Sequence, residues 1–383
     1  MNRRVAALFL GHLANDSLYS SLPPLLPLLV ATYGLSTALV GAIPAVYMMV
    51  ASFLQPLFGQ LFDRMGKTWM MSVGLLMGGL ALMSLGYMES YPAIVAAAAI
   101  GGLGSAIFHP VATSLSSNVE GDDRASNVSV FMLGGNLGLS IGPLIILSTL
   151  TTFHIRGTFM ALVLPAIAAL ILFRLRAGLS KPSTERVGGV RVNRWALLLV
   201  LLASVLRGTA TITLITYLPL YITSLGLSVG VGGLMLAVML LSGGLGMVVA
   251  GRIGDRFNKM LSASALLFSA GPAVLLFSRT SSDTVWLLAG VMGFTLLSAH
   301  PLIVVIAHEL LPDRTGLASA LTYGVAFGLS NLFIPLIGSA IDVVGFSGTL
   351  QAMAALPVLA GLATLLTYRI RAVRREQASA STV

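Results

Sequence analysis

The chain has 383 residues, of which 56% are hydrophobic and only 9% are charged. A soluble globular domain carries about 25% charged residues, so this composition excludes a soluble protein and indicates an integral membrane protein. The net charge of +9 is no argument for nucleic-acid binding, because the basic residues gather between apolar segments. The chain contains no cysteine, which excludes a disulfide framework and a thiolate metal site.

Apolar segments recur along the whole chain, most of them long enough to cross a hydrocarbon core of about 30 Å as a helix. The first follows a basic start that resembles a signal peptide, but no small-residue cleavage site follows, so we expect it to be retained. The pattern predicts an all-α integral membrane protein with twelve transmembrane helices. The predicted spans are 5–31, 37–62, 68–88, 91–118, 125–151, 157–173, 195–222, 229–254, 260–279, 284–311, 315–341 and 348–369.

The basic residues are distributed unequally between the two sides of the predicted bundle. Nineteen of the 22 Lys and Arg residues lie at the chain ends or in alternate loops. Only Arg156 and Arg279 lie in the other set of loops, and Arg207 lies within a span. Loops rich in Lys and Arg stay in the cytoplasm, so the asymmetry predicts a multi-pass protein of the cell membrane with both termini cytoplasmic.

The longest polar stretch, residues 174–194, separates spans six and seven and is rich in basic residues, Gly, Pro and Ser. We predict a cytoplasmic linker there. It divides the chain into an N-terminal six-helix bundle at 1–173 and a C-terminal six-helix bundle at 195–370, followed by a cytoplasmic tail at 371–383.

The two predicted bundles carry the same motifs in the same order, which indicates an internal duplication. GQLFDRMGK at 59–67 returns as GRIGDRFNK at 251–259, which is 192 positions later. Three shorter matches follow with offsets of 191, 190 and 190: HP at 109–110 and 300–301, DR at 123–124 and 313–314, and GLS at 138–140 and 328–330.

The GxxxDRxGK element after the second span, its second copy after the eighth and the basic central loop resemble the major facilitator superfamily over almost the whole chain. Within it, HLANDSLYSSLPPLLPLL, GLGSAIFHP, GNLGLSIGP and LPDRTGLASAL resemble the fosmidomycin resistance group of drug exporters. The resemblance implies two pseudo-symmetric halves and a monomer. Val111 follows His109 and Pro110, where members of that group often carry a carboxylate, so no role for that acid is transferred to this chain.

The two GxxxDR loops are candidate conformational latches, and the resemblance implies that they hold the halves in the outward-open state. Simple cytoplasmic turns are the alternative. Gly66 is expected to adopt a positive φ at the turn, and Asn258 replaces it in the second copy as the next residue to tolerate that region. The predicted latch residues are Gly59, Asp63, Arg64, Gly251, Asp255 and Arg256.

The fifth predicted span contains GNLGLSIGP. Gly138 and Gly142 are four residues apart, so they share one helix face and permit close contact with another helix. Pro143 removes a backbone hydrogen bond and favours a kink. The motif resembles the antiport signature of facilitator proteins without its trailing glycines, so a general packing face is an equal alternative.

Four ionisable residues lie near the middle of predicted spans, where a charge is costly unless it faces water or a partner. Asp16 lies about 16 Å into the first span at a rise of 1.5 Å per residue. Arg207 lies at a similar depth in the seventh, and His109 and His300 lie about ten to twelve residues from the ends of the fourth and tenth. The resemblance implies that these four helices line a central cavity.

Asp16 and His109 are the candidates for proton coupling, because both side chains can exchange a proton. Arg207 stays charged, so it either binds an anionic substrate group or neutralises Asp16, and a purely structural ion pair is the alternative. His300 is a substrate ligand or a packing histidine. The remaining candidates for the substrate site, all in the first span, are His12, Asn15 and Tyr19, and His12 shares a helix face with Asp16.

These features predict a proton-coupled antiporter that exports a small polar or anionic drug-like compound by alternating access. Proton-coupled uptake or facilitated diffusion of an organic anion or other metabolite is the transport alternative. A non-transporting receptor on the same scaffold is the alternative from another class. An enzyme is not expected, because no nucleophile with a base, metal set or long catalytic loop is evident. The predicted partners are the substrate, protons and the bilayer, with no nucleic acid, cofactor or metal.

Overall fold

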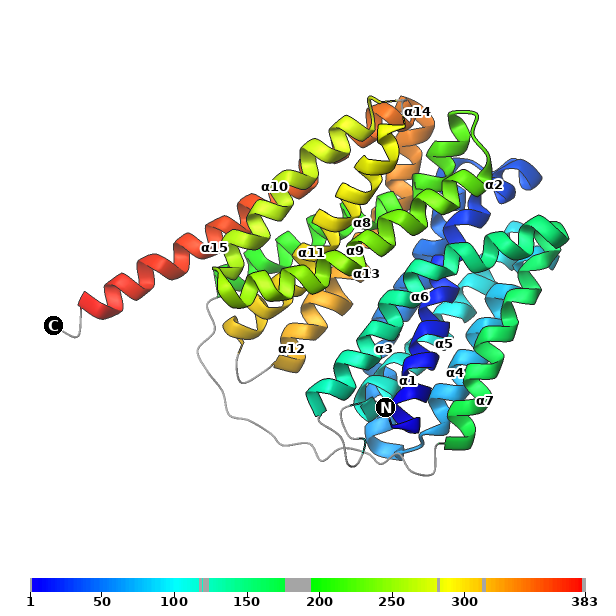
Figure 1. Cartoon of the computed structure of the whole chain (residues 1–383), viewed down its shortest axis with the longest axis horizontal. Coiled ribbons are helices and arrows are strands. Elements are labelled where there is room, and N and C mark those ends of the chain that lie inside the picture. The colour runs from blue at the N-terminus through cyan, green and yellow to red at the C-terminus, as the bar shows by residue number, and fades with distance from the viewer. Residues whose placement is uncertain are drawn as a thin grey trace. The chain divides into compact units, whose positions relative to one another are not determined.

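The computed structural model describes residues 2–116, 119, 124–175, 194–280, 283–311 and 315–380. All of its regular elements within these residues are helical (Figure 1). Most of the predicted linker, the end of the predicted tail and three residues of the DR motifs, Asp123, Asp313 and Arg314, lie outside the described residues.

The first part of the chain forms nine helical elements. They are α1 (Arg3–Ser20), α2 (Leu22–Tyr33), α3 (Thr37–Met65), α4 (Trp69–Met83), the 3-10 turn η1 (Leu85–Tyr87), α5 (Tyr91–Ser116), α6 (Arg124–Phe153), the 3-10 segment η2 (His154–Leu162) and α7 (Val163–Leu175). The second part forms another nine. They are α8 (Arg194–Ser224), α9 (Val229–Arg256), α10 (Lys259–Phe277), α11 (Thr284–Leu310), α12 (Thr315–Ser319), the π-helical turn η5 (Ala320–Val325), α13 (Ala326–Leu332), α14 (Ile334–Met353) and α15 (Ala355–Ala380).

Among the described residues, nine helical stretches are long and apolar enough to cross a membrane. Two of them, Asn127–Leu175 and Leu317–Ile370, have 49 and 54 residues. At 1.5 Å per residue each is more than about 70 Å long, twice what one crossing of a 30 Å core requires. Gly345, with a φ of 83°, breaks the second stretch. Helices α1 and α2, which follow one another before the first of these nine stretches, supply a further segment. The arrangement is therefore an all-α membrane fold consistent with twelve spans.

The described residues group into two compact units. Unit 1 comprises Met1–Glu185, Ile215–Ala237 and Ile334–Ser339, and unit 2 comprises Arg186–Leu214, Val238–Phe333 and Ala340–Val383. Each unit contains one cluster of buried polar side chains.

Glycines bring α6 against α1 in unit 1. A Cβ atom added at Gly138 would lie 2.2 Å from the carbonyl oxygen of Leu13, and one at Gly142 would lie 2.1 Å from Oγ of Ser20. Neither distance is possible, so the backbones meet only because these positions carry no side chain. Pro143 lies inside α6, and the helix continues beyond it to Phe153.

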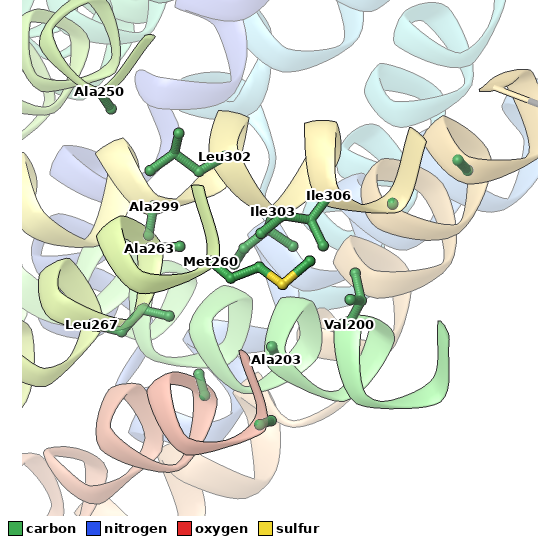
Figure 2. Close-up of a cluster of buried hydrophobic side chains, with 14 of the residues drawn as sticks. Val200, Ala203, Ala250, Met260, Ala263, Leu267, Ala299, Leu302, Ile303 and Ile306 are labelled. Carbon is green, nitrogen blue, oxygen red and sulfur yellow. The ribbon is translucent and has the colours of Figure 1, made fainter. Parts of the chain in front are cut away.

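Unit 2 has a core of small and branched apolar side chains (Figure 2). The cluster mixes alanines with larger side chains, and α10 packs against both α11 and α15. In lipid this packing is held by van der Waals contact rather than by removal of apolar surface from water. The side chains labelled in Figure 2 are Val200, Ala203, Ala250, Met260, Ala263, Leu267, Ala299, Leu302, Ile303 and Ile306.

The two copies of the loop motif end differently. Gly66 ends α3 with a φ of 63°, the left-handed conformation that glycine adopts without strain. The expectation that Asn258 would replace it in this role is wrong. Asn258 has a φ of −65° and an extended backbone, and its side chain accepts hydrogen bonds from the amides of Met260 and Leu261. It therefore begins α10 as an N-cap instead of ending α9.

Candidate functional site

The cluster in unit 1 has the carboxylate of Asp16 at its centre. Nε2 of His12 lies 3.3 Å from one carboxylate oxygen, and Nε2 of His109 lies 3.2 Å from the other. His12 precedes Asp16 by one turn of α1, whereas His109 comes from α5. The side chain of Asp16 is 17% exposed, so the carboxylate is largely removed from solvent and depends on these partners.

The hydrogen bonds of His12 require a proton to be shared inside this cluster. Nδ1 of His12 lies 2.8 Å from the carbonyl oxygen of Phe131, which can only accept, so Nδ1 carries a hydrogen and donates. The contact between Nε2 of His12 and Asp16 then also needs a hydrogen. Either His12 is an imidazolium or the carboxyl group of Asp16 is protonated.

Further contacts hold the cluster in place. Asn15 donates from Nδ2 to Asp16 at 3.1 Å and to Oγ of Ser105 at 3.2 Å. Nδ1 of His109 lies 3.0 Å from the same Oγ, so the opposite ring nitrogen is left to face Asp16. The ring of His12 stacks on Phe131 of α6 with centroids 4.1 Å apart.

Gly135 of α6 makes room for the cluster. A Cβ atom added there would lie 2.5 Å from Nε2 of His12 and 2.8 Å from Oδ2 of Asp16. Ser105, Phe131 and Gly135 were not predicted from the sequence. The spacing of Ser105 one helical turn before His109 is a signal that could have found it.

The same cluster could hold a metal ion. One ligand atom each from His12, Asp16 and His109 lie within 4.8 Å of one another. The sequence offered no close-spaced ligand motif, because the second histidine is supplied by a different helix.

The cluster in unit 2 has the buried guanidinium of Arg207 at its centre, and only 2% of this residue is exposed. One terminal nitrogen lies 3.1 Å from Nδ1 of His300. The other lies 3.4 Å from the carbonyl oxygen of Leu296 and 3.5 Å from Oγ1 of Thr211. Among the described residues of unit 2, no carboxylate pairs with Arg207.

Two aromatic side chains complete this second cluster. The guanidinium carbon of Arg207 lies 5.8 Å from the centre of the Phe327 ring, within the range of a cation–π contact. The ring of Tyr323 meets His300 edge-on with centroids 4.4 Å apart. Tyr323 lies in the π-helical turn η5, a distortion that is frequent at functional sites. No signal in the sequence indicated this turn, and Thr211, Tyr323 and Phe327 were not predicted.

The predicted residues are thus distributed over both units. His12, Asn15, Asp16 and His109 meet in unit 1, and Arg207 meets His300 in unit 2. Among the described residues, Tyr19 forms no hydrogen bond with the first cluster through its hydroxyl. Its ring stacks on Tyr47 at 5.5 Å, and its buried hydroxyl has no hydrogen-bond partner among the described residues. The predicted pairing of Asp16 with Arg207, which belong to different units, stays a prediction.

The predicted latch residues lie at the ends of two helices. Gly59, Asp63 and Arg64 lie in the last two turns of α3, and Gly251, Asp255 and Arg256 occupy the corresponding part of α9. An added Cβ at Gly59 would make only an ordinary contact of 3.5 Å with Pro110, and one at Gly251 would meet nothing within 4 Å. Within each unit, close packing therefore does not require glycine at either position.

Long apolar helices with buried ionisable side chains define the chain as a multi-pass membrane protein, and such buried polar groups are candidates for a functional site. The sequence profile of the Major Facilitator Superfamily matches residues 8–321 and 200–382. The chain belongs to the Major Facilitator Superfamily.

Individual relatives agree with this assignment. The chain is 29% identical over 378 residues to the fosmidomycin resistance protein of Escherichia coli, covering 94% of this chain and 92% of the relative. It is 28% identical to YfnC, an uncharacterised MFS-type transporter of Bacillus subtilis, covering 93% and 90%. A crystal structure of a bacterial homologue of the human lysosomal transporter Spinster has the same fold, with a TM-score of 0.78, 14% identity and coverage of 95% and 96%.

Proposed function

We propose that the protein is a proton-coupled antiporter that exports a small polar or anionic drug-like compound across the cell membrane. The observation that carries this proposal is the position of His12 between the carbonyl oxygen of Phe131 and the carboxylate of Asp16, because these two contacts require a proton between His12 and Asp16. The same carboxylate lies within hydrogen-bond distance of His109. A buried group of this kind can load and release a proton as its access to the two sides of the membrane changes.

In this proposal Asp16 and His109 carry the coupling proton, and His12 and Asn15 hold Asp16 in position. Arg207 and His300 bind the substrate in the other unit, and Tyr19 offers a further hydroxyl. The two six-helix halves alternate access to the site, and the ends of α3 and α9 latch the transporter in one state. We propose that both termini lie in the cytoplasm, in accordance with the distribution of Lys and Arg. We also propose a monomer, as the family resemblance implies.

The likeness to the fosmidomycin resistance protein supports export of an antimicrobial compound, because resistance is what that relative is named for. The residues of the first cluster do not fix the direction of transport, since the same carboxylate can serve antiport or symport. Direction is therefore part of the test. A receptor on the same scaffold would bind a solute without moving it.

The test uses purified protein in liposomes that enclose a pH-sensitive dye. Organic anions and antimicrobial compounds, identified first by the resistance of a pump-deficient host that expresses the chain, are added outside. Antiport predicts that solute entry drives protons out of the lumen, whereas symport carries them in. Asp16→Asn should abolish this proton movement but retain exchange of labelled for unlabelled solute.

Three results would contradict the proposal. If Asp16→Asn moves protons at the wild-type rate, the carboxylate of Asp16 does not couple transport to protons. Proton entry together with the solute would establish uptake by symport. Tight binding of a solute that never crosses the liposome membrane would establish a receptor.

A further inference from the structure

The buried pair of Arg207 and His300 fixes the chemistry of what can bind beside it. We infer that this pair is an oxyanion site. It selects solutes in which a carboxylate, or a similar anionic group that only accepts hydrogen bonds, is attached to a planar apolar moiety. This inference deepens the proposed function by naming the class of its substrate. It also assigns roles to His300, Tyr323 and Phe327 that determine specificity.

The contact with Arg207 fixes the tautomer of His300. All guanidinium nitrogens of arginine donate, so the nitrogen of Arg207 that lies 3.1 Å from Nδ1 of His300 makes Nδ1 an acceptor. The hydrogen of the imidazole is therefore on Nε2. A protonated imidazole would place a hydrogen on Nδ1 as well, and two donors and two positive charges would then face each other. Arg207 thus holds His300 as a neutral donor that points its Nε2–H away from the guanidinium.

Two hydrogen-bond donors in this cluster have no acceptor among the described residues. Nε2 of His300 and Nε of Arg207 are buried and have no hydrogen-bond partner among the described residues. A buried N–H without an acceptor costs about 1–3 kcal/mol. Within the described part of unit 2, no carboxylate balances the positive charge of Arg207 either. An anion with free lone pairs is the group that would satisfy both.

Other classes of ligand fit the pair less well. A cation would be repelled by Arg207. A neutral amide could accept hydrogen bonds through its carbonyl oxygen only and carries no charge to balance the guanidinium, so it should bind much more weakly than an anion. A carboxylate has only acceptors and pairs with a guanidinium in two parallel hydrogen bonds. Phosphate, phosphonate and sulfate groups share this chemistry.

The aromatic pair sets the shape of the remaining part of the ligand. The rings of Tyr323 and Phe327 lie nearly parallel, with centroids 6.4 Å apart and an interplanar angle of 8°. Both rings contact the pair: their centroids lie 4.4 Å and 5.4 Å from that of the His300 ring, and the Phe327 ring also lies 5.8 Å from the guanidinium carbon of Arg207. Tyr323 is 45% exposed and carried by a π-helical turn, so it is the neighbour of His300 that can move to admit a ligand.

The experiment uses the full-length protein in lipid nanodiscs and three probes of equal shape, namely benzoate, benzamide and benzamidine, which are anionic, neutral and cationic. Thermal stabilisation is followed against probe concentration without any pH gradient. Benzoate should stabilise the wild type, while benzamide and benzamidine should have no effect at the same concentrations. Stabilisation by benzamide or benzamidine equal to that by benzoate would overturn the inference.

Variants of the two residues separate charge from tautomer. Arg207→Gln should weaken benzoate binding about tenfold or more, because a charge-assisted hydrogen bond is lost. His300→Gln places an amide N–H near the position of Nε2 and should stay within about threefold of wild type, whereas His300→Asn reaches only the position of Nδ1 and should lose about tenfold. Equal binding by the two His300 variants would overturn the assignment of Nε2 as the donor. The control is His154→Asn, which changes an exposed histidine outside both clusters.

The oxyanion site and the proposed proton-coupled export can be disproved separately. If benzoate binds as expected but no solute moves protons in liposomes, the oxyanion site stands and proton-coupled export does not. If the wild type couples transport to protons while Arg207→Gln transports the same solute with unchanged apparent affinity, export stands and the oxyanion site does not.

Discussion

Nε2 of His109 in α5 lies 3.2 Å from Oδ1 of Asp16 in α1, and His12 occupies the other carboxylate oxygen at 3.3 Å. The carboxylate is therefore held between two imidazoles from two helices. A substitution at one imidazole can test whether the arrangement carries a proton or only holds the helices together.

His109→Gln should separate these two roles. The glutamine amide can still donate a hydrogen bond to Asp16, so the helices stay in contact, but it cannot take up a proton. We expect transport driven by a pH gradient to fall about tenfold or more, while exchange of labelled for unlabelled solute stays within about twofold. Gradient-driven transport equal to that of wild type at every pH from 5 to 8 would rule out His109 as a carrier. His154→Asn serves as the histidine control.

Gly135→Ala should disturb the same cluster from the side of α6. The added methyl group would lie within 3 Å of both the His12 ring and the Asp16 carboxylate. The His12 ring is held in place, because it stacks on the Phe131 ring and forms a hydrogen bond with the carbonyl oxygen of Phe131. We expect gradient-driven transport to be lost in proteoliposomes.

The control for this prediction is Gly244→Ala, since a Cβ there would meet nothing within 4 Å. An alanine in place of a helical glycine should raise stability by about 0.5–1 kcal/mol and leave transport unchanged. Full coupling by Gly135→Ala would show that the His12–Asp16 contact is not needed.

Asn258 should behave as an N-cap in unfolding experiments. Asn258→Ala removes the side-chain acceptor for the amides of Met260 and Leu261 and should lower the free energy of unfolding by about 1 kcal/mol. Asn258→Asp keeps an acceptor and should remain within about 0.5 kcal/mol of wild type. Thermal unfolding in detergent measures both variants, and equal losses in the two would argue against capping.

Tyr217 ties three segments of unit 1 together. Its buried hydroxyl donates to the carbonyl oxygen of Ile334 at 2.8 Å and lies 3.4 Å from that of Thr37. A Cβ at Gly338 would lie 2.5 Å from this hydroxyl, so the glycine leaves space for it. Tyr217→Phe should cost about 1 kcal/mol and favour states in which this contact is open.

Cysteine labelling can detect this opening, because the chain has no native cysteine. Val40 is 0% exposed in unit 1, and a cysteine there should react with a maleimide about fivefold faster when combined with Tyr217→Phe. A cysteine at Ala263 in the core of unit 2, also 0% exposed, should react equally slowly in both backgrounds. An unchanged rate at position 40 would show that Tyr217 does not hold this contact closed.

Features that depend only on residues close together in the sequence could be predicted from the sequence. The apolar segments identify the membrane helices, and the positive φ of Gly66 follows from the conformational freedom of glycine. The same reasoning failed at Asn258. Asn favours both left-handed turns and N-caps, and only the position of the following helix decides between them.

The candidate site was accessible only in part. Counting residues along a helix gives the depth of Asp16 and His109, and the four-residue spacing places His12 beside Asp16. Counting along one helix does not show which face it turns toward a neighbouring helix, so Ser105, Phe131 and Gly135 were not predicted. The same limit hid Tyr323, whose position depends on a π-helical turn that has no signature in the residues around it.

The sequence by itself determined that this is a membrane protein of the facilitator type, because hydropathy and sequence motifs are properties of the chain alone. Tertiary structure decided which polar groups meet. In unit 1, glycines of α6 let its backbone touch α1, and that approach places the carbonyl oxygen of Phe131 against His12. The protonation of the cluster follows from this contact, since a carbonyl oxygen can only accept a hydrogen bond.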